Sequence, residues 1–180
     1  MVELTEEHPD DVGVVASLFL NHVRIQAGEA VFIAAGVLHS YVRGLGVELM
    51  ATSDNVLRAG LTPKHVAVQE VLRCVSYVAG VPQPLVPEVV GDVSIYDPPV
   101  PDFSLWVYTP CAAGDDATRS AVAGPPKGAR IIVSCGERTV LSRRAQQLVL
   151  EPGQAAFIPD ADGPFDILTN GAVAVACHRQ

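Results

Sequence analysis

The sequence is poor in basic side chains. Its 180 residues include 12 Lys and Arg against 20 Asp and Glu, so the formal net charge is −8. Nucleic acids and anionic membrane surfaces are both bound by basic surfaces, and this balance therefore argues against either as a partner. It does not exclude a small anionic substrate, which needs only a local cluster of positive charge.

Long hydrophobic segments are also lacking. The longest uncharged apolar stretch, residues 30–38, has nine residues, whereas a membrane-spanning helix needs roughly 20. The acidic beginning, MVELTEEHPDD, has no apolar core and is not typical of a secretory signal. Four scattered cysteines without CxxC spacing give a zinc knot no support, and reduced thiols are the simpler interpretation. We therefore expect a cytoplasmic protein.

Proline and glycine are abundant, at 14 and 15 residues, and they divide the chain into short pieces. The apolar, often β-branched runs between them predict strands. Residues 10–16, with two acids at the start, and 68–74, with one apolar face, predict helices. The predicted fold class is mainly β with a few short helices, as in a sandwich or barrel. The predicted strands are residues 18–25, 30–33, 46–50, 105–109, 131–134, 148–150, 155–158 and 172–177.

A proline-rich stretch divides the sequence into two blocks. Because proline removes backbone donors, we interpret residues 77–101 as a connector or edge-strand region. It separates a first block, residues 1–76, from a second block, residues 102–180. Within the second block, the polar residues 112–128 predict a surface loop.

An internal repeat links the two blocks. Residues 27–34, AGEAVFIA, match residues 152–159, PGQAAFIP, at a constant offset of 125. In both copies a glycine turn precedes a short apolar strand, as expected if one jelly-roll element is used twice. Eleven residues after the glycine, the first copy reaches His39 and the second reaches Pro164. We therefore expect any metal site in the first block and a metal-free second barrel.

The residues from the first copy onward carry a family resemblance. The turn and the histidine that follows it are similar to a conserved motif of the cupin superfamily. The strings VLHSY at 37–41, GVELM at 46–50 and SDNVLRAGLTPKH at 53–65 closely resemble type I mannose-6-phosphate isomerases. The resemblance is strong over about residues 18–68 and looser through the second block.

This resemblance implies a fold and a chemistry. Enzymes of this family are zinc-dependent aldose–ketose isomerases that interconvert mannose 6-phosphate and fructose 6-phosphate. The chain would then contain the closing part of a catalytic cupin barrel, followed by a cupin-like jelly roll as the C-terminal accessory barrel. His39 would be the last zinc ligand and Arg58 the active-site arginine. Tyr41, Asp54 and Lys64 would line the same pocket and bind substrate.

These residue types suit the implied reaction. Moving a proton between C1 and C2 of a sugar develops negative charge on oxygen, which a divalent cation or a fixed guanidinium stabilises. Arg58 and Lys64 supply local positive charge for a sugar phosphate in an acidic chain. Simpler interpretations stay open. His39 and Tyr41 suit packing, Asp54 suits a turn or helix cap, and Arg58 and Lys64 suit solvent.

The sequence also departs from the family. The other zinc ligands, a Gln-x-His pair and a Glu, would lie upstream together with the general base, and this chain contains no QxH or HxH. A zinc site cannot be completed from His39 alone. Three hypotheses follow: part of an isomerase that lacks its N-terminal half, a half that binds sugar phosphate or a partner chain, or a metal-free cupin acting as an interaction module. Apolar Leu18, Phe19, Leu20 and Val23 favour the first.

Overall fold

The computed structural model describes residues 2–53, 56–110, 121–125 and 127–179. Its contacts divide the chain into two compact units. The N-terminal unit comprises residues 1–46 and 52–84, and the C-terminal unit comprises residues 47–51 and 85–180. No helix in the described part of the chain is long and apolar enough to cross a membrane.

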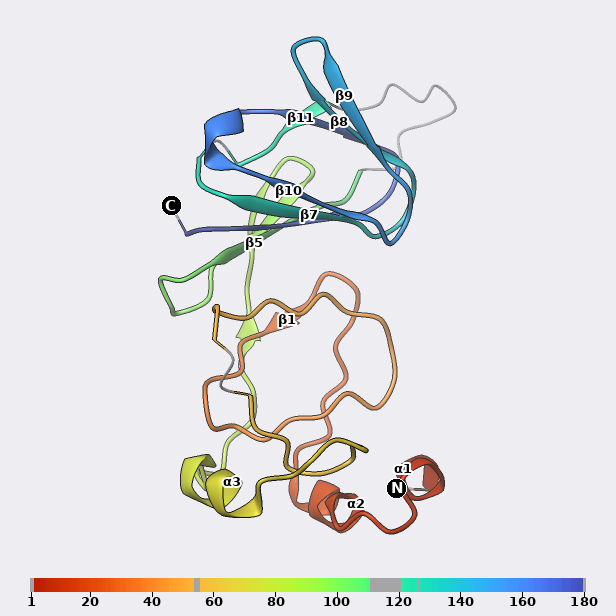
Figure 1. The fold of residues 1–180 in the computed structure, drawn as a ribbon, viewed down its shortest axis with the longest axis vertical. Coiled ribbons are helices and arrows are strands. Elements are labelled where there is room, and N and C mark those ends of the chain that lie inside the picture. Colours follow the sequence, from red (N-terminus) through yellow and green to blue (C-terminus); the bar gives the residue numbers. More distant parts are fainter. Residues whose placement is uncertain (1, 54–55, 111–120, 126, 180) are drawn as a thin grey trace. The chain divides into compact units, whose positions relative to one another are not determined.

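The C-terminal unit contains two antiparallel sheets, visible as two layers in Figure 1. Alternating apolar residues and turn residues at the strand ends explain why these short runs pair. The six-stranded sheet has the order β10 (Ala155–Ile158), β7 (Arg130–Ser134), β12 (Val173–Cys177), β5 (Ser104–Tyr108), β4 (Val93–Tyr96) and β3 (Glu88–Val90). The four-stranded sheet has the order β6 (Ala121–Ala123), β11 (Asp166–Thr169), β8 (Thr139–Arg143) and β9 (Gln146–Leu150), and the 3-10 turn η2 (Asp160–Asp162) precedes β11.

One hydrophobic core lies between these sheets. Ile132 and Val175 from the larger sheet and Ile167 from the smaller one are fully buried. Trp106, the single tryptophan of the chain, packs against this cluster from β5. Burying a valine or isoleucine side chain stabilises the folded state by about 1.5–3 kcal/mol. These buried residues therefore hold the two sheets together. The other members are Val93, Tyr108, Leu141, Leu150, Phe165 and Val173.

A buried arginine fastens the loops at one end of this core. The side chain of Arg130 has no exposed surface, and its two terminal nitrogens donate to the carbonyls of Gly128 and Gly163. Its guanidinium carbon lies 5.3 Å from the centre of the Phe165 ring, within the range of a cation–π contact. Oδ1 of Asp160 lies 3.8 Å from one terminal nitrogen of the Arg130 side chain. Arg130 therefore connects the segments before β7 and β11.

The N-terminal unit has little regular structure (Figure 1). Its elements are α1 (Val2–Glu7), α2 (Gly13–Ala16), the 3-10 turn η1 (Ser17–Phe19), β1 (Ala30–Val31) and α3 (Val68–Cys74). β1 pairs with β2 (Pro84–Leu85), whose first residue is the last of this unit. Among its described residues, the buried large apolar side chains are Leu4 and Val14. Many others are exposed, including Phe19 at 86% and Leu45 at 96%. This unit therefore lacks a core comparable with that of the C-terminal unit.

The predicted strands are confirmed mainly where a neighbouring strand pairs with them. α3 has the bounds that the sequence predicts, and the predicted strands of the second block are present. The predicted strands at residues 18–25 and 46–50 are wrong: the first begins as η1 and continues without regular structure, and the second is irregular. An isolated strand leaves its backbone groups unpaired, which explains the difference. α1 was not expected.

The proline-rich residues 77–101 contain more than a connection. β3 and β4 lie in this stretch, and β3 forms the edge of the six-stranded sheet beyond β4. Proline is tolerated at such edges because one side of the strand needs no partner. Residues 112–120 and 126 of the predicted surface loop lie outside the described residues, and the described remainder includes β6.

The internal repeat is a structural repeat. Gly28 has φ +82° and Gly153 has φ +83°, the conformation required at the third position of a type II turn. The N–H of Glu29 donates to the carbonyl of Gln26 at 3.0 Å, and that of Gln154 donates to Glu151 at 2.9 Å. β1 and β10 begin directly after these turns.

Candidate functional site

Two of the predicted site residues lie together on one loop. The rings of His39 and Tyr41 are 6.1 Å apart between centroids and meet edge to face at 73°. Nδ1 of His39 is 3.0 Å from the carbonyl oxygen of Val37. Because a carbonyl only accepts, Nδ1 donates in this contact, which leaves Nε2 as the nitrogen with a lone pair in the neutral ring. That is the state in which imidazole binds a metal.

The segment 53–65 contains the other predicted site residues. Arg58 and Lys64 are both exposed, on either side of a bend at Gly60 and Leu61. Gly60 has φ +151° and Leu61 has φ +54°, a left-handed value that is rare for a leucine. Asp54, a predicted substrate-binding residue, lies outside the described residues.

The Leu61 bend is attached to another part of the unit through Asp11. Oδ2 of Asp11 accepts the N–H of Leu61 at 2.6 Å, and Oδ1 accepts the N–H of Gly13 at 2.7 Å. These N–H groups, first that of Gly13, lower the pKa of the Asp11 carboxyl below its ordinary value. Sequence reasoning assigned Asp11 only to a helix start. The Asp-x-Gly pattern, typical of a local side-chain turn, was the available signal.

The described residues do not form a complete metal site. No group of three or more His, Cys, Asp and Glu side chains among them could hold a metal ion. Zinc in proteins takes three or four such ligands, which is more than the described residues bring together at any one place.

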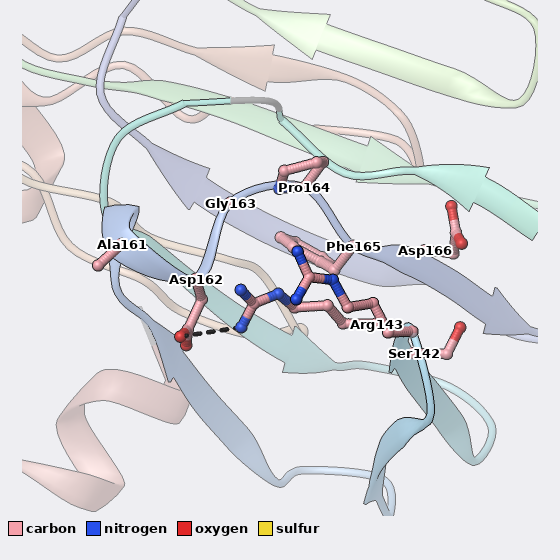
Figure 2. A pocket seen from close by; sticks show the side chains of 9 residues that line it. Ser142, Arg143, Ala161, Asp162, Gly163, Pro164, Phe165 and Asp166 are labelled. Atoms are coloured by element: carbon pink, nitrogen blue, oxygen red, sulfur yellow. Dashed lines mark hydrogen bonds and ion pairs between the residues drawn. The ribbon is translucent and has the colours of Figure 1, made fainter.

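A cavity of about 400 Å³ lies in the C-terminal unit, between the β8–β9 turn and the segment before β11. Arg143 reaches Asp162 across it, with nitrogen and oxygen 3.2 Å apart, and Phe165 and Pro164 form part of its wall (Figure 2). None of the residues predicted for the site lines this cavity. Pro164, the counterpart of His39 in the repeat, does line it, and proline has no metal-binding side chain.

The described members of the predicted site are thus His39 with Tyr41 on one loop, and Arg58 and Lys64 on either side of the Gly60–Leu61 bend, all in the N-terminal unit. An imidazole and cationic side chains are groups that can take part in metal-assisted chemistry on an anionic substrate, and the described residues include no group of three or more metal-binding side chains. Comparisons with known proteins specify the class further.

No protein-family model matches the chain. The mannose-6-phosphate isomerase of Salmonella typhimurium is 35% identical over 173 residues, covering 95% of this chain and 42% of that protein. The Bos taurus enzyme is 37% identical over 165 residues, covering 88% of this chain and 38% of that protein. The solved Salmonella typhimurium structure with substrate and zinc bound has a TM-score of 0.75 and 31% identity, covering 98% of this chain and 44% of that one.

The chain is therefore a homologue of mannose-6-phosphate isomerases and matches their C-terminal part. It spans about 42% of the length of the Salmonella typhimurium protein. A further solved structure of a mannose 6-phosphate isomerase contains zinc and yttrium. Zinc is thus a metal that these relatives bind.

Proposed function

We propose that this chain forms the C-terminal half of a mannose-6-phosphate isomerase and is inactive alone. The observation that carries the proposal is the match to the isomerases across 95% of the chain, which includes His39 and the 53–65 segment. The substrate is then a sugar phosphate, mannose 6-phosphate or fructose 6-phosphate.

The roles of the side chains follow from their chemistry. Arg58 carries the catalytic role, because a fixed guanidinium stabilises the charge that develops on oxygen as a proton moves between C1 and C2. Lys64, Tyr41 and Asp54 bind substrate, with the Lys64 ammonium suited to an anionic group. His39 contributes one zinc ligand through Nε2. No catalytic step is assigned to the metal, since the described residues of this chain do not complete its site.

The finer architecture is also part of the proposal. Residues 102–180 form a metal-free, cupin-like jelly roll, and residues 1–76 form the closing part of a catalytic cupin barrel. Two antiparallel sheets around one core in the C-terminal unit support the first assignment. Sparse strands and exposed apolar residues in the N-terminal unit support the second. A cytoplasmic location remains a prediction from composition.

In this proposal the chain acts together with a polypeptide segment equivalent to the N-terminal half of the relatives. Exposed side chains of the N-terminal unit, such as Leu18, Phe19 and Leu45, supply apolar surface that such a partner would cover. It would also provide the other zinc ligands and the general base.

The test measures isomerase activity with added zinc, first for the purified chain and then for the chain coexpressed with the N-terminal part of the Salmonella typhimurium enzyme. We expect no turnover alone and turnover for the pair. Turnover of the chain alone contradicts the proposed incompleteness. A copurifying pair without turnover contradicts the catalytic assignment, and failure to copurify contradicts the partner.

Arg58→Ala in the active pair tests the assigned role. We expect kcat to fall by about 10²–10³, with a smaller change in KM, because developing charge is felt mainly in the transition state. Arg24→Ala, at another exposed arginine of the same unit, is the matched control and leaves kcat unchanged. A raised KM with unchanged kcat contradicts the catalytic role. His39→Ala is expected to remove bound zinc, measured as metal content.

One alternative is kept because the chain supplies so few metal ligands. A metal-free cupin module that binds a sugar phosphate or a partner chain without catalysis also fits the lack of a metal-binding cluster among the described residues. Binding of mannose 6-phosphate by the chain, together with an inactive copurifying pair, favours this alternative.

A further inference from the structure

We propose that Asp11 is a positioning residue that holds the backbone between Arg58 and Lys64 in the form needed for catalysis. The inference rests on the proposed function, because it concerns the same site. Asp11 lies 50 residues from Leu61 in sequence, and no sequence motif links the two segments.

The carboxylate joins two segments, using one oxygen for each. Oδ1 accepts the N–H of Gly13 at 2.7 Å, and Oδ2 accepts the N–H of Leu61 at 2.6 Å. The N–H of Thr62 also interacts with it and contributes to its lowered pKa. Bonds between ionised acceptors and N–H groups are stronger than neutral ones, so both segments are held by the same charge.

The backbone held in this way is strained. Leu61 has φ +54°, and a branched residue stays in this region only when its surroundings fix it there. The approach is also close: a Cβ added to Gly60 would lie 2.9 Å from Oδ1 of Asp11 and 3.2 Å from Cα of Gly13. The glycine at position 60 therefore permits the contact, and the Asp11 carboxylate maintains it.

The strained bend leads directly to the two cationic side chains. The N–H of Lys64 donates to Oγ1 of Thr62 at 3.2 Å, and Pro63 between them has a fixed φ. Arg58 precedes Gly60 by two residues. Because few free torsions separate the bend from either residue, loss of the Asp11 bonds displaces both cations from their positions.

The decisive variant is Asp11→Asn in the active pair of chains. The asparagine has the same size, but its NH₂ group cannot accept the second N–H. We expect kcat to fall about 10- to 100-fold, since a displacement of about 1 Å in a catalytic group has an effect of this size. The control, Glu3→Gln, removes another acidic contact of the N-terminal unit, the 2.6 Å ion pair with Arg43, and leaves kcat unchanged.

A second variant separates positioning from general stability. Adding Leu61→Gly to Asp11→Asn removes the penalty of the left-handed conformation, so the bend no longer needs the carboxylate. We expect the double variant to recover at least about threefold in kcat over Asp11→Asn. If Asp11 is merely structural, kcat per folded molecule is unchanged in Asp11→Asn and the loss is seen only in the folded fraction. Trp106 fluorescence checks that the C-terminal unit stays folded in every variant.

An amide measurement distinguishes failure of this inference from failure of the proposed function. Hydrogen exchange at the Leu61 N–H is measured in the isolated chain, where no activity is needed. Faster exchange in Asp11→Asn shows that the Asp11 carboxylate holds the Leu61 N–H. If the wild-type pair is inactive at the same time, the proposed function is overturned but this contact is not. An active wild-type pair with wild-type kcat in Asp11→Asn, or unchanged Leu61 exchange, overturns this inference.

Discussion

The same turn precedes a strand in both units, yet the two strands differ. Gly28 and Gly153 have the same φ within one degree, and both turns close with the same backbone hydrogen bond. The side chain of the fourth residue also accepts the first N–H in each: Glu29 to Gln26 at 2.7 Å, and Gln154 to Glu151 at 2.9 Å. β1 then has two residues, whereas β10 has four.

The difference lies in what each strand pairs with. All four residues of β10 pair with β7, in register from Ala155 opposite Val133 to Ile158 opposite Arg130. β1 pairs only with the two-residue β2. Local sequence is thus enough to form the turn, but a strand extends only as far as a neighbouring strand accepts its hydrogen bonds.

The largest effect is expected from removing core volume in the C-terminal unit. Ile132→Ala removes a side chain with 0% exposure and is expected to lower the free energy of unfolding by about 2–5 kcal/mol. Ile131→Ala, one residue away and 50% exposed, is the matched control. Urea unfolding followed by Trp106 fluorescence measures both. Equal losses would show that the strand, rather than the core, determines stability.

Thiol reactivity provides a second contrast between the units. Burial, and next the nearby Asp97, raise the pKa of Cys177 to about 11, whereas Cys74 is exposed. Because the thiolate is the reactive form, a raised pKa lowers reactivity at pH 8. We expect Cys74 to be alkylated on the order of a hundredfold faster, measured by mass spectrometry of the labelled peptides. Similar rates would contradict the buried position of Cys177.

Substituting the paired glycines tests the comparison itself. A Cβ would meet nothing within 4 Å at Gly28 or Gly153, so an alanine introduces only conformational strain of about 1–2 kcal/mol. We expect Gly153→Ala to shift the Trp106 unfolding midpoint and Gly28→Ala to leave it nearly unchanged, because β10 belongs to the sheet that contains Trp106. Equal shifts in the two variants would mean that the units unfold together.

The smallest effect is expected from acid on the N-terminal unit. The pKa of Asp11 is lowered from 3.8 by backbone N–H groups, with a smaller contribution from His8. A depressed pKa gives stability that is complete above the unfolded value and is lost as the pH falls through the folded value. The protection factor of the Leu61 amide, which compares its exchange rate with the intrinsic rate at the same pH, should therefore fall as the pH drops below about 3.8, and Asp11→Asn should remove this pH dependence of the protection factor. An unchanged pH profile in the variant would contradict the anchoring.

Sequence reasoning predicted what local patterns and nearby partners determine. The glycine turns and α3 follow from short stretches of sequence, and the C-terminal strands find partners within the chain. Residues 18–25 have the same apolar pattern, but η1 and irregular backbone are found instead. The pattern specifies apolar surface, and the presence of a pairing strand decides whether that surface becomes a sheet.

In the candidate site, too, local sequence predicts contacts between near neighbours but not contacts between distant segments. His39 and Tyr41, two residues apart, could be expected to lie together. Asp11 could not be linked to Leu61, because their contact depends on two distant segments meeting and on a φ value that leucine rarely adopts. Side-chain bonds across 50 residues leave no periodic signal in a single sequence.

The arginine buried beside the C-terminal core has a consequence for folding kinetics. Arg130 donates to two carbonyls 35 residues apart, at Gly128 and Gly163, and a guanidinium loses its water at high cost unless its acceptors are in place. We therefore expect these bonds to form after the sheets have met, late on the folding pathway. A late contact determines how slowly a native protein unfolds and has little effect on how fast it folds. We expect an Arg130→Met substitution to speed unfolding of the C-terminal unit more than it slows folding, as measured by Trp106 fluorescence.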